Sequence, residues 1–547
     1  MPLDLPALSR KSMLLAVLPL SIYMAACQDD AANAPTAADT PASAPAPADV
    51  PALVSPLAIP VWVNGRHAVV DGGGKLRIPF ENEYHLLLPV DYRDTVFAAS
   101  DEGWSLISAD GEKVIKANIS NTIGNLTPGI FWFEEKGKYG VIDTQGNVIQ
   151  PPRYDEIYFL DDDRKFILYA IGGKSGLMNA KGEPVTEAVY DEIASESSYA
   201  GYGGLIMAKR DSENWLIDSR SGAQEKVPYN KIRAGSENDI YRIATDEHGK
   251  QGIIDANGKL VIAVKYAELG QVSEGLVSFR EDYGSPCGYL DVEGKVILAA
   301  KYSKCTPFGK KGALVQEEGN AQTGEAGQYG LLDRQGAWVV APKYAEAYDA
   351  GVGSGWGQYV PGITAISVGD IFNYKHGLFD TDKGVEILTP EYALVSVLTD
   401  KILGFATAES PRVSVSEFDS LPAIGLMDYA GKVLLPPERF TMIRLDSSEK
   451  FLIAVTQGKQ ALIGLDGKEI IAPEWQKLET NTALGLILAY ETRLDSGGDS
   501  VDILRAAYDF NGKPLFAVRT NPCGAEILLD GGGKTLWPQD ATPYCTQ

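Results

Sequence analysis

Residues 138–157, KYGVIDTQGNVIQPPRYDEI, decide the fold of this chain. Two short apolar runs, Val141-Ile142 and Val148-Ile149, stand on either side of an Asp-x-x-Gly sequence. Such a sequence between β-prone runs predicts a hairpin, because glycine supplies the positive φ that a tight turn requires. A pair of prolines and a Tyr-Asp-Glu-Ile exit follow. The stretch therefore predicts two short antiparallel strands and a defined exit from them.

The same pattern recurs along most of the chain. Clear copies begin at Gly140, Gly176, Trp215, Gly252, Gly288, Gly330, Gly377, Gly425 and Ala461. Weaker copies begin at Ser105 and Ala506, and the two ends carry AVVDGGGK from Ala68 and ILLDGGGK from Ile527. A third apolar run, such as residues 166–170, separates each exit from the next copy. Because helical periodicity is absent, each unit is predicted to be a meander of about three short strands.

This pattern resembles the WG (KWG) β-repeats of bacterial proteins, over roughly residues 60 to 540. Trp rarely precedes the repeat glycine here; the residues at that position are Tyr139, Ser175, Gln251, Cys287, Tyr329 and His376. The resemblance implies an all-β array and does not imply one activity. We expect residues 58–547 to form about thirteen units stacked as a superhelical β-solenoid, with the DGGGK units as caps. A closed, β-propeller-like arrangement is the alternative.

The first 26 residues have the pattern of an export signal. Arg10 and Lys11 precede an apolar run, Met13 to Met24, that is too short to span a bilayer well. The sequence Met24-Ala25-Ala26-Cys27 resembles the lipobox of bacterial lipoproteins. This resemblance implies cleavage before Cys27, a diacylglyceryl group on its sulfur and an acyl chain such as palmitate on its new amino terminus. An ordinary secretory peptide with a free Cys27 thiol is the alternative.

Residues 27–57 are dominated by Ala, Pro, Thr, Ser and Asp, a composition that predicts a disordered tether between lipid and folded body. Gln28 follows the cysteine, where Asp would favour retention in the inner membrane. We therefore expect a lipid-anchored protein of a Gram-negative cell envelope, with the outer membrane as its location and Cys27 as its membrane anchor.

Composition and motifs give little sign of catalysis. The net charge is −24, which opposes nucleic-acid binding because a phosphate backbone needs a basic surface. The four histidines, His67, His85, His248 and His376, lack metal-ligand spacing, and no nucleophile elbow or phosphate loop is present. We expect no catalytic residue, no metal site and no cofactor.

Two recurring residue types are predicted to be structural because they occur once per unit. The aspartates of the turns, for example Asp143 and Asp255, are expected to accept backbone N–H groups. The exit tyrosines, for example Tyr154 and Tyr344, are expected to pack in the core with their hydroxyls hydrogen-bonded at its edge.

Four cysteines besides Cys27 form an even number in an exported chain. Cys287 precedes a repeat glycine, and Cys305 lies eighteen residues later, at the position of Ile157, Leu269 and Leu478 in other units. If these two positions touch in every unit, Cys287 and Cys305 form a disulfide, and Cys523 pairs with Cys545. Free thiols are the alternative.

Two units exceed the usual spacing of 36 residues, since Gly330, Gly377 and Gly425 are 47 and 48 residues apart. The first insertion, residues 352–374, carries Trp356, Tyr359 and Tyr374, which we interpret as a possible binding loop. The leading functional hypothesis is a non-enzymatic scaffold lipoprotein that binds protein or glycan partners at the envelope. The alternative is a glycan hydrolase that uses acidic residues in a groove or channel.

Overall fold

A computed structural model describes Leu53 and residues 57–540. Within that range the residues outside the description are 91, 121–122, 128, 161–165, 194–203, 237–239, 320–325, 350–359, 370–372, 416–419 and 495–499. The described residues form strands β1 to β50. Among these residues, no helix has the length and apolarity needed to cross a membrane.

The strands are short and follow one another in chain order around the molecule. The first are β1 (Ile59–Val63), β2 (Arg66–Val70), β3 (Leu76–Ile78), β4 (Leu86–Pro89), β5 (Thr95–Ser100), β6 (Gly103–Ser108), β7 (Val114–Ser120), β8 (Ile123–Thr127), β9 (Ile130–Glu135), β10 (Lys138–Asp143), β11 (Val148–Tyr154), β12 (Glu156–Phe159), β13 (Phe166–Ile171), β14 (Lys174–Asn179), β15 (Glu192–Ile193), β16 (Leu205–Arg210), β17 (Glu213–Asp218) and β18 (Ala223–Lys226). Next come β19 (Lys231–Ser236), β20 (Tyr241–Thr245), β21 (Gln251–Asp255), β22 (Leu260–Tyr266), β23 (Glu268–Leu269), β24 (Leu276–Arg280), β25 (Cys287–Asp291), β26 (Val296–Tyr302), β27 (Lys304–Cys305), β28 (Ala313–Gln316), β29 (Tyr329–Leu332), β30 (Trp338–Tyr344), β31 (Glu346–Asp349), β32 (Ile363–Val368), β33 (Lys375–Asp380) and β34 (Val385–Tyr392). The last are β35 (Leu394–Val397), β36 (Ile402–Ala406), β37 (Arg412–Ser414), β38 (Ser420–Pro422), β39 (Ile424–Asp428), β40 (Val433–Phe440), β41 (Met442–Leu445), β42 (Phe451–Thr456), β43 (Lys459–Gly464), β44 (Glu469–Trp475), β45 (Lys477–Asn481), β46 (Leu486–Leu494), β47 (Ser500–Asp509), β48 (Pro514–Thr520), β49 (Glu526–Asp530) and β50 (Thr535–Trp537).

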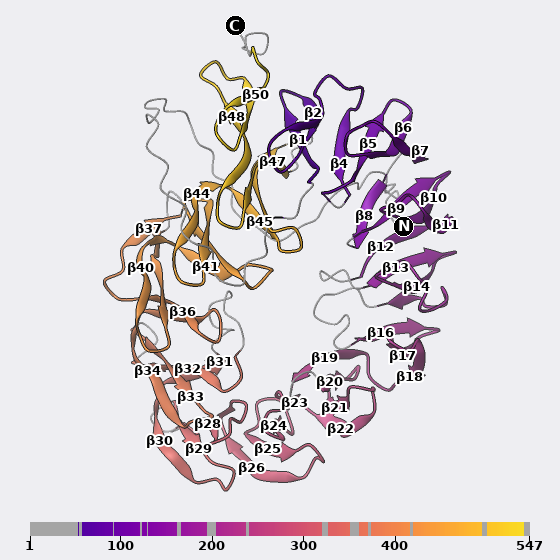
Figure 1. The fold of residues 1–547 in the computed structure, drawn as a ribbon. Coiled ribbons are helices and arrows are strands. Elements are labelled where there is room, and N and C mark those ends of the chain that lie inside the picture. The colour runs from indigo at the N-terminus through magenta and orange to yellow at the C-terminus, as the bar shows by residue number, and fades with distance from the viewer. Residues whose placement is uncertain are drawn as a thin grey trace, which may run out of the picture.

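These strands form small antiparallel sheets arranged in a ring (Figure 1). Most sheets have four strands, as in β23-β24-β25-β26, and β37 and β38 form a separate hairpin. In the ring, β19, β23 and β31 lie toward the centre, while β22, β26 and β30 lie at the outer rim (Figure 1). The all-β repeat prediction is confirmed, and the arrangement is the propeller-like alternative rather than the open solenoid.

Most of the sheets have one strand more than the predicted meander. The innermost strand follows directly from the exit tyrosine, so Tyr266 ends β22 and β23 begins two residues later, in the next sheet. This innermost strand has only two residues in β15, β23 and β27. In these three units the strand is too short to leave a periodic pattern in the sequence, so the prediction missed it.

The repeat glycine is required by close packing between the third and fourth strands. A register shift interrupts their pairing on both sides of Ile253, opposite Ile262. There a Cβ at Gly252 would lie 2.6 Å from the carbonyl oxygen of Ile262, and one at Gly330 would lie 2.6 Å from that of Val340. Since no side chain fits at such a distance, Gly252 and Gly330 cannot be replaced without a shift of the fourth strand.

The ring closes where the first sheet, β1 to β3, meets the last sheet, β45 to β50. One hydrophobic core spans both sheets and includes Val61, Phe80, Phe516 and Trp537. The Phe80 and Trp537 rings stack with their centroids 4.1 Å apart. In addition, the backbone N–H of Asn64 donates to Oε2 of Glu526 over 2.8 Å. Residues more than 450 positions apart therefore form one joint.

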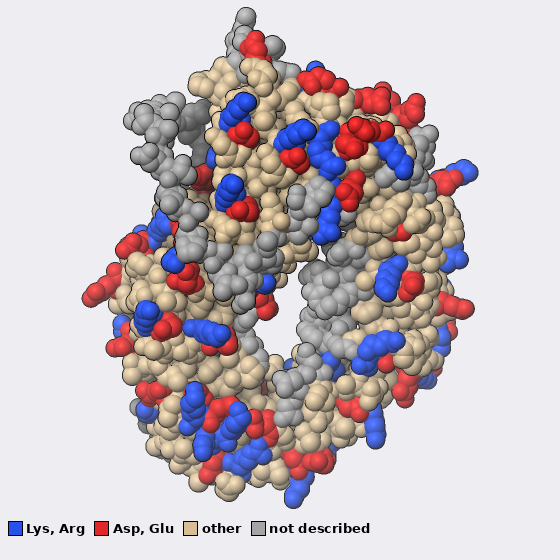
Figure 2. All heavy atoms as spheres, viewed as in Figure 1, with Lys and Arg blue, Asp and Glu red and all other residues tan. Residues whose placement is uncertain are grey.

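The DGGGK units, predicted to be separate caps, contact each other at this joint. Gly74 has φ +79°, and a Cβ there would lie 3.0 Å from the carbonyl oxygen of Leu515 and 3.3 Å from Cα of Asp530. The capping prediction is wrong because these two units bury their apolar faces against one another and leave no open end. Figure 2 shows the resulting opening through the ring, with basic and acidic side chains interspersed on the visible face.

Candidate functional site

The connections between strands divide the ring into two faces. Because successive strands of a sheet run in opposite directions, the first connection and the third connection emerge on the same face. The third connection is the Asp-x-x-Gly turn, so we call this the turn face. The opposite face carries the second connection of each sheet and the passage to the next sheet.

The turn aspartates are structural, as predicted. Oδ1 of Asp143 accepts the backbone N–H groups of Gln145 at 2.9 Å and Asn147 at 2.8 Å. The same pair of bonds recurs at Asp71, Asp255, Asp291, Asp333, Asp428, Asp509 and Asp530. These carboxylates hold the turns and do not form a repeated catalytic or calcium motif.

The exit tyrosines are core residues, which confirms that prediction as well. Tyr154 and Tyr190 are fully buried, and Tyr344 is 1% exposed. Their hydroxyls donate to neighbours at the edge of the core, for example from Tyr190 to Oε1 of Gln224 and from Tyr344 to Oε1 of Glu386, both over 2.5 Å. A ladder of exposed rings for stacking on sugars is therefore not formed by these three tyrosines.

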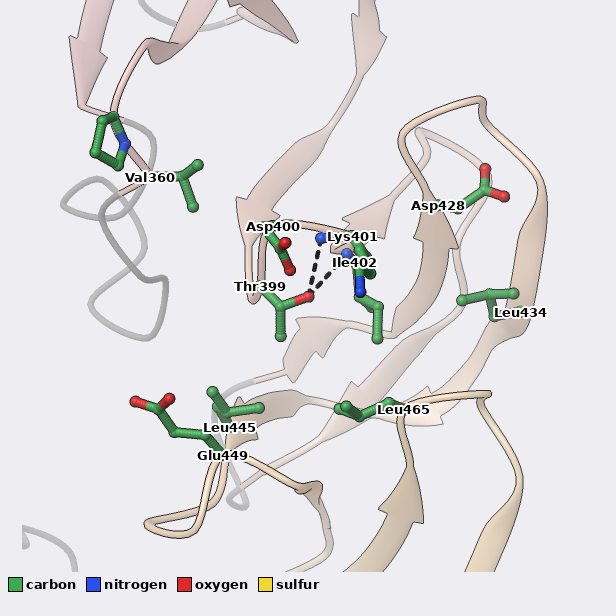
Figure 3. A pocket seen from close by; sticks show the side chains of 11 residues that line it. Val360, Thr399, Asp400, Lys401, Ile402, Asp428, Leu434, Leu445, Glu449 and Leu465 are labelled. Atoms are coloured by element: carbon green, nitrogen blue, oxygen red, sulfur yellow. Dashed lines mark hydrogen bonds between the residues drawn. The ribbon is translucent and has the colours of Figure 1, made fainter. Parts of the chain in front are cut away.

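A pocket with a volume of about 560 Å³ opens among the loops of three consecutive sheets (Figure 3). Val360 and Asp428 lie at its two ends, and Leu445 and Leu465 face Ile402 across it (Figure 3). Oγ1 of Thr399 accepts the N–H groups of Lys401 at 3.1 Å and Ile402 at 3.0 Å, which fixes the tight loop between β35 and β36.

A second pocket of about 520 Å³ continues the first, because both are lined by Val360, Pro361 and Asp400. We call the two together the turn-face groove. Its further lining residues are Lys310, Ile363, Asp380, Asp382, Lys383, Ile387 and Tyr429. The groove is built by loops of the sheets β31–β34, β35–β40 and β41–β44, together with Lys310 from the sheet before them. These loops are the Asp-x-x-Gly turns and the connections between the first and second strands of each sheet, which we call the first loops.

The acidic residues at one end of this groove form ion pairs with lysines. Nζ of Lys310 lies 2.5 Å from Oδ2 of Asp382, and Nζ of Lys383 lies 2.7 Å from Oδ2 of Asp380. Partial burial opposes ionisation of Asp382, but hydrogen bonds from Lys310 outweigh it and lower the pKa of this carboxyl. The Asp382 carboxylate is thereby held in the charged form, which suits recognition of a partner better than proton transfer.

The predicted binding loop is divided by a strand. Trp356 and Tyr359 lie outside the described residues, whereas Val360 and Pro361, which follow directly, line both halves of the groove. β32 then crosses the sheet, so Tyr374 lies on the opposite face, where its ring centroid is 6.3 Å from that of His376. The structure therefore does not bring Tyr374 to the groove, and a role for Trp356 and Tyr359 remains a prediction.

Sequence reasoning missed most of the groove. Thr399 to Ile402, Leu445 and Glu449 come from first loops, which vary in length and carry no motif. The length of the two long units was a partial signal, because the extra residues of the first precede Val360 and Pro361, which line the groove. The extra length of the second forms the hairpin β37–β38, between β36 and β39 and on the opposite face.

The cysteine prediction holds for the pair that the structure describes. Cys287 and Cys305 form a disulfide that joins β25 to β27 in the next sheet. The two positions also touch in other units: Oε1 of Gln251 accepts the N–H of Leu269 at 2.8 Å, and Oε1 of Gln460 accepts that of Leu478 at 2.9 Å. Cys523 is disulfide-bonded too, and its predicted partner Cys545 lies outside the described residues. Cys27 also lies outside them.

Comparison with known proteins identifies the repeat. A search of curated proteins returned no match. Among solved structures, a eukaryotic initiation factor is similar with a TM-score of 0.39 and 13% identity, over 71% of this chain and 94% of that one. The computationally designed Ika8 protein is similar with a TM-score of 0.27 and 11% identity, over 56% of this chain and 92% of that one. Both scores are too low to establish a shared fold.

The family model described as "WG containing repeat" matches residues 139–174, 252–283, 288–320 and 329–350. These stretches begin at or within one residue of the repeat glycine position and fall between β10 and β31. The chain therefore carries WG repeats at these four stretches of its ring of small antiparallel sheets.

Proposed function

We propose that the protein is a non-enzymatic scaffold of the bacterial cell envelope, tethered through a lipid on Cys27, that binds a protein or glycan partner in the turn-face groove. The observation that carries this proposal is the construction of the groove. Apolar side chains from three sheets, Ile402, Leu445 and Leu465 among them, form its floor beneath a charged rim. An apolar centre with a polar rim is the usual anatomy of a recognition surface.

The charged rim favours binding over hydrolysis. A glycosidase needs one carboxyl group held protonated beside an ionised one. Here Asp380 and Asp382 are paired with lysines, and Asp428 accepts the N–H groups of its own turn. A partner that offers both charges and apolar groups would complement this surface, and a protein surface provides that combination more readily than a neutral glycan.

The test reverses charge on the rim. Asp400 and Glu449 are exposed and line the groove. We expect the double substitution Asp400→Lys and Glu449→Lys to abolish recovery of partners in a cross-linking pull-down of the native lipoprotein from envelopes, with an unchanged melting temperature. The matched control is Glu293→Lys, an exposed turn residue on the same face in the sheet β23–β26.

Two outcomes would contradict the proposal. Recovery of the same partners by the double variant would remove the groove as the binding site. Release of new reducing ends when the purified protein is incubated with envelope glycans, together with loss of that release in the double variant, would favour the hydrolase alternative.

A further inference from the structure

The first sheet of the ring lacks the innermost strand that the regular sheets have. It contains only β1, β2 and β3. The Asn64-Gly65 turn after β1 corresponds to the second connection of a regular sheet, and the Asp71 turn after β2 corresponds to the third. β1 is therefore equivalent to a second strand, and the position on its inner side has no strand among the described residues.

The residues before β1 follow the path of a first loop. The backbone N–H of Ala58 donates to the carbonyl oxygen of Tyr92 over 2.7 Å. Leu53 packs on the core of the ring joint, where its Cδ2 is 3.7 Å from the position of a Cβ on Gly72, in the Asp71 turn. Leu53 thus lies on the turn face, where the described first loops of the regular sheets lie. In those sheets the residues just before the first loop form the innermost strand.

A cavity of about 490 Å³ lies at the position of the missing strand. It is lined by β1 (Pro60, Trp62), β4 of the next sheet (Leu86, Leu88) and the strands β46 and β47 of the last sheet (Tyr490, Leu504). Its walls are mostly apolar and include the aromatic rings of Trp62, Tyr92 and Tyr490. Grooves lined by aromatic side chains are the usual docking sites for proline-rich extended segments.

The pairing of β1 with β2 determines which of its backbone groups face the cavity. Asn64 has φ +46° and Gly65 has φ +77°, which is typical of a two-residue type I′ turn closed by the hydrogen-bonded pair Val63 and Arg66. Hydrogen-bonded pairs alternate along the ladder, so Val61 and Ile59 also bond to β2. The backbone groups of Trp62 and the carbonyl of Pro60 therefore point to the inner side.

The tether carries a matching pattern just before Leu53. Within residues 44–52, APAPADVPA, the prolines Pro45, Pro47 and Pro51 occupy only odd-numbered positions. In an extended strand alternate N–H groups point to the same side. The even-numbered residues therefore keep all N–H groups on one side, and the prolines fall on the side where an edge strand faces open space. This spacing suits a strand that pairs with β1 on one edge only.

We propose that residues 44–52 of the tether dock as the innermost strand of the first sheet, pairing with β1 and filling the cavity beside Trp62. The occupant is the chain's own segment because it enters the ring at this point. Only the part of the tether before residue 44 then spans the distance to the membrane, so docking sets the height and orientation of the ring above the lipid.

The experiment introduces proline within residues 44–52 of the full chain, either where the N–H group faces β1 or where it faces the open side. Ala48→Pro with Val50→Pro removes two N–H groups that face β1, and we expect hydrogen–deuterium exchange at the Trp62 amide to become about tenfold faster or more. Asp49→Pro removes an N–H on the open side and is expected to leave exchange unchanged, with Asp49→Ala as a control for the lost charge. Since these positions lie in the tether, the fold of the ring does not depend on them.

Equal exchange in the wild type, the double variant and a chain lacking residues 28–52 would overturn the proposal, because the cavity would then be empty in solution. Faster exchange in Asp49→Pro as well, with Asp49→Ala unchanged, would overturn the assigned side of pairing. Protection that disappears on dilution, together with a dimer in sedimentation, would show that a second copy's tether fills the site and would overturn docking within one chain.

Discussion

Neighbouring sheets are held together by different kinds of contact at two joints of the ring. The joint between the sheets β23–β26 and β27–β30 uses positions that recur in every unit, and here the contact between them is the Cys287–Cys305 disulfide. The joint between the first and last sheets uses residues that occur once, such as Asn64, Arg505 and Glu526. Regular joints are therefore encoded locally and repeated, whereas closure of the ring depends on a set of singular residues far apart in sequence.

The largest expected effect is at the closure joint. Arg505 is 3% exposed, and its guanidinium lies 2.6 Å from Oε1 of Glu526 and 2.8 Å from Oε2 of Glu491. Because Arg505→Leu leaves the buried carboxylate of Glu526 without its nearer cation, we expect it to lower the free energy of unfolding by about 3–5 kcal/mol. Urea denaturation followed by circular dichroism measures this. A loss below about 1 kcal/mol would mean that closure does not depend on the network.

The next largest effect is expected at the joint that contains the disulfide. Cys287 and Cys305 enclose a loop with a sequence separation of 18, so replacing both by Ser should lower the free energy of unfolding by about 3 kcal/mol. The ring should stay closed, because this joint also shares an apolar core that includes Tyr289 and Phe308. Small-angle scattering should therefore give the same radius of gyration for the double variant and the wild type, whereas an expanded ring would contradict the distinction between the two joints.

Acid should act on the closure joint through His67, which lines the cavity beside β1. Burial lowers the pKa of His67 from 6.5 to about 4. Between these values the unfolded chain binds a proton that the folded chain does not, so stability falls as the pH drops from 6.5 to about 4. We expect the urea midpoint of the wild type to fall over this range more steeply than that of His67→Gln. If the urea midpoints of the wild type and His67→Gln fall in parallel with pH, His67 is not held neutral in the folded chain.

The smallest expected effect concerns a regular joint without a disulfide. Gln460→Ala removes the hydrogen bond to the N–H of Leu478 and should cost about 1 kcal/mol. Replacing both Gln460 and Leu478 by Cys should instead form a second disulfide, because the two positions match Cys287 and Cys305. Mass spectrometry after digestion without reductant would detect the cross-link. Two free thiols under oxidising conditions would show that the joints are not equivalent.

The sequence predicted the repeat, its turns and its disulfide because these features depend on near neighbours. Glycine recurs where a Cβ would meet a backbone carbonyl, and aspartate recurs where a turn presents N–H groups, so each unit carries its own signal. The Cys287–Cys305 pairing followed from comparing units, without any structure. The groove was harder to predict, because Val360, Ile402 and Leu445 belong to loops of three different sheets and share no motif.

By itself, then, the amino-acid sequence determined that the chain is an all-β array of units of about 36 residues with structural aspartates and buried tyrosines. Only the tertiary structure decided that the array closes. Closure depends on the angle between successive sheets, which accumulates over the whole ring and is set by side-chain packing at every joint. The residues that complete it, Asn64 and Glu526 among them, are 462 positions apart and leave no local or periodic trace in the sequence.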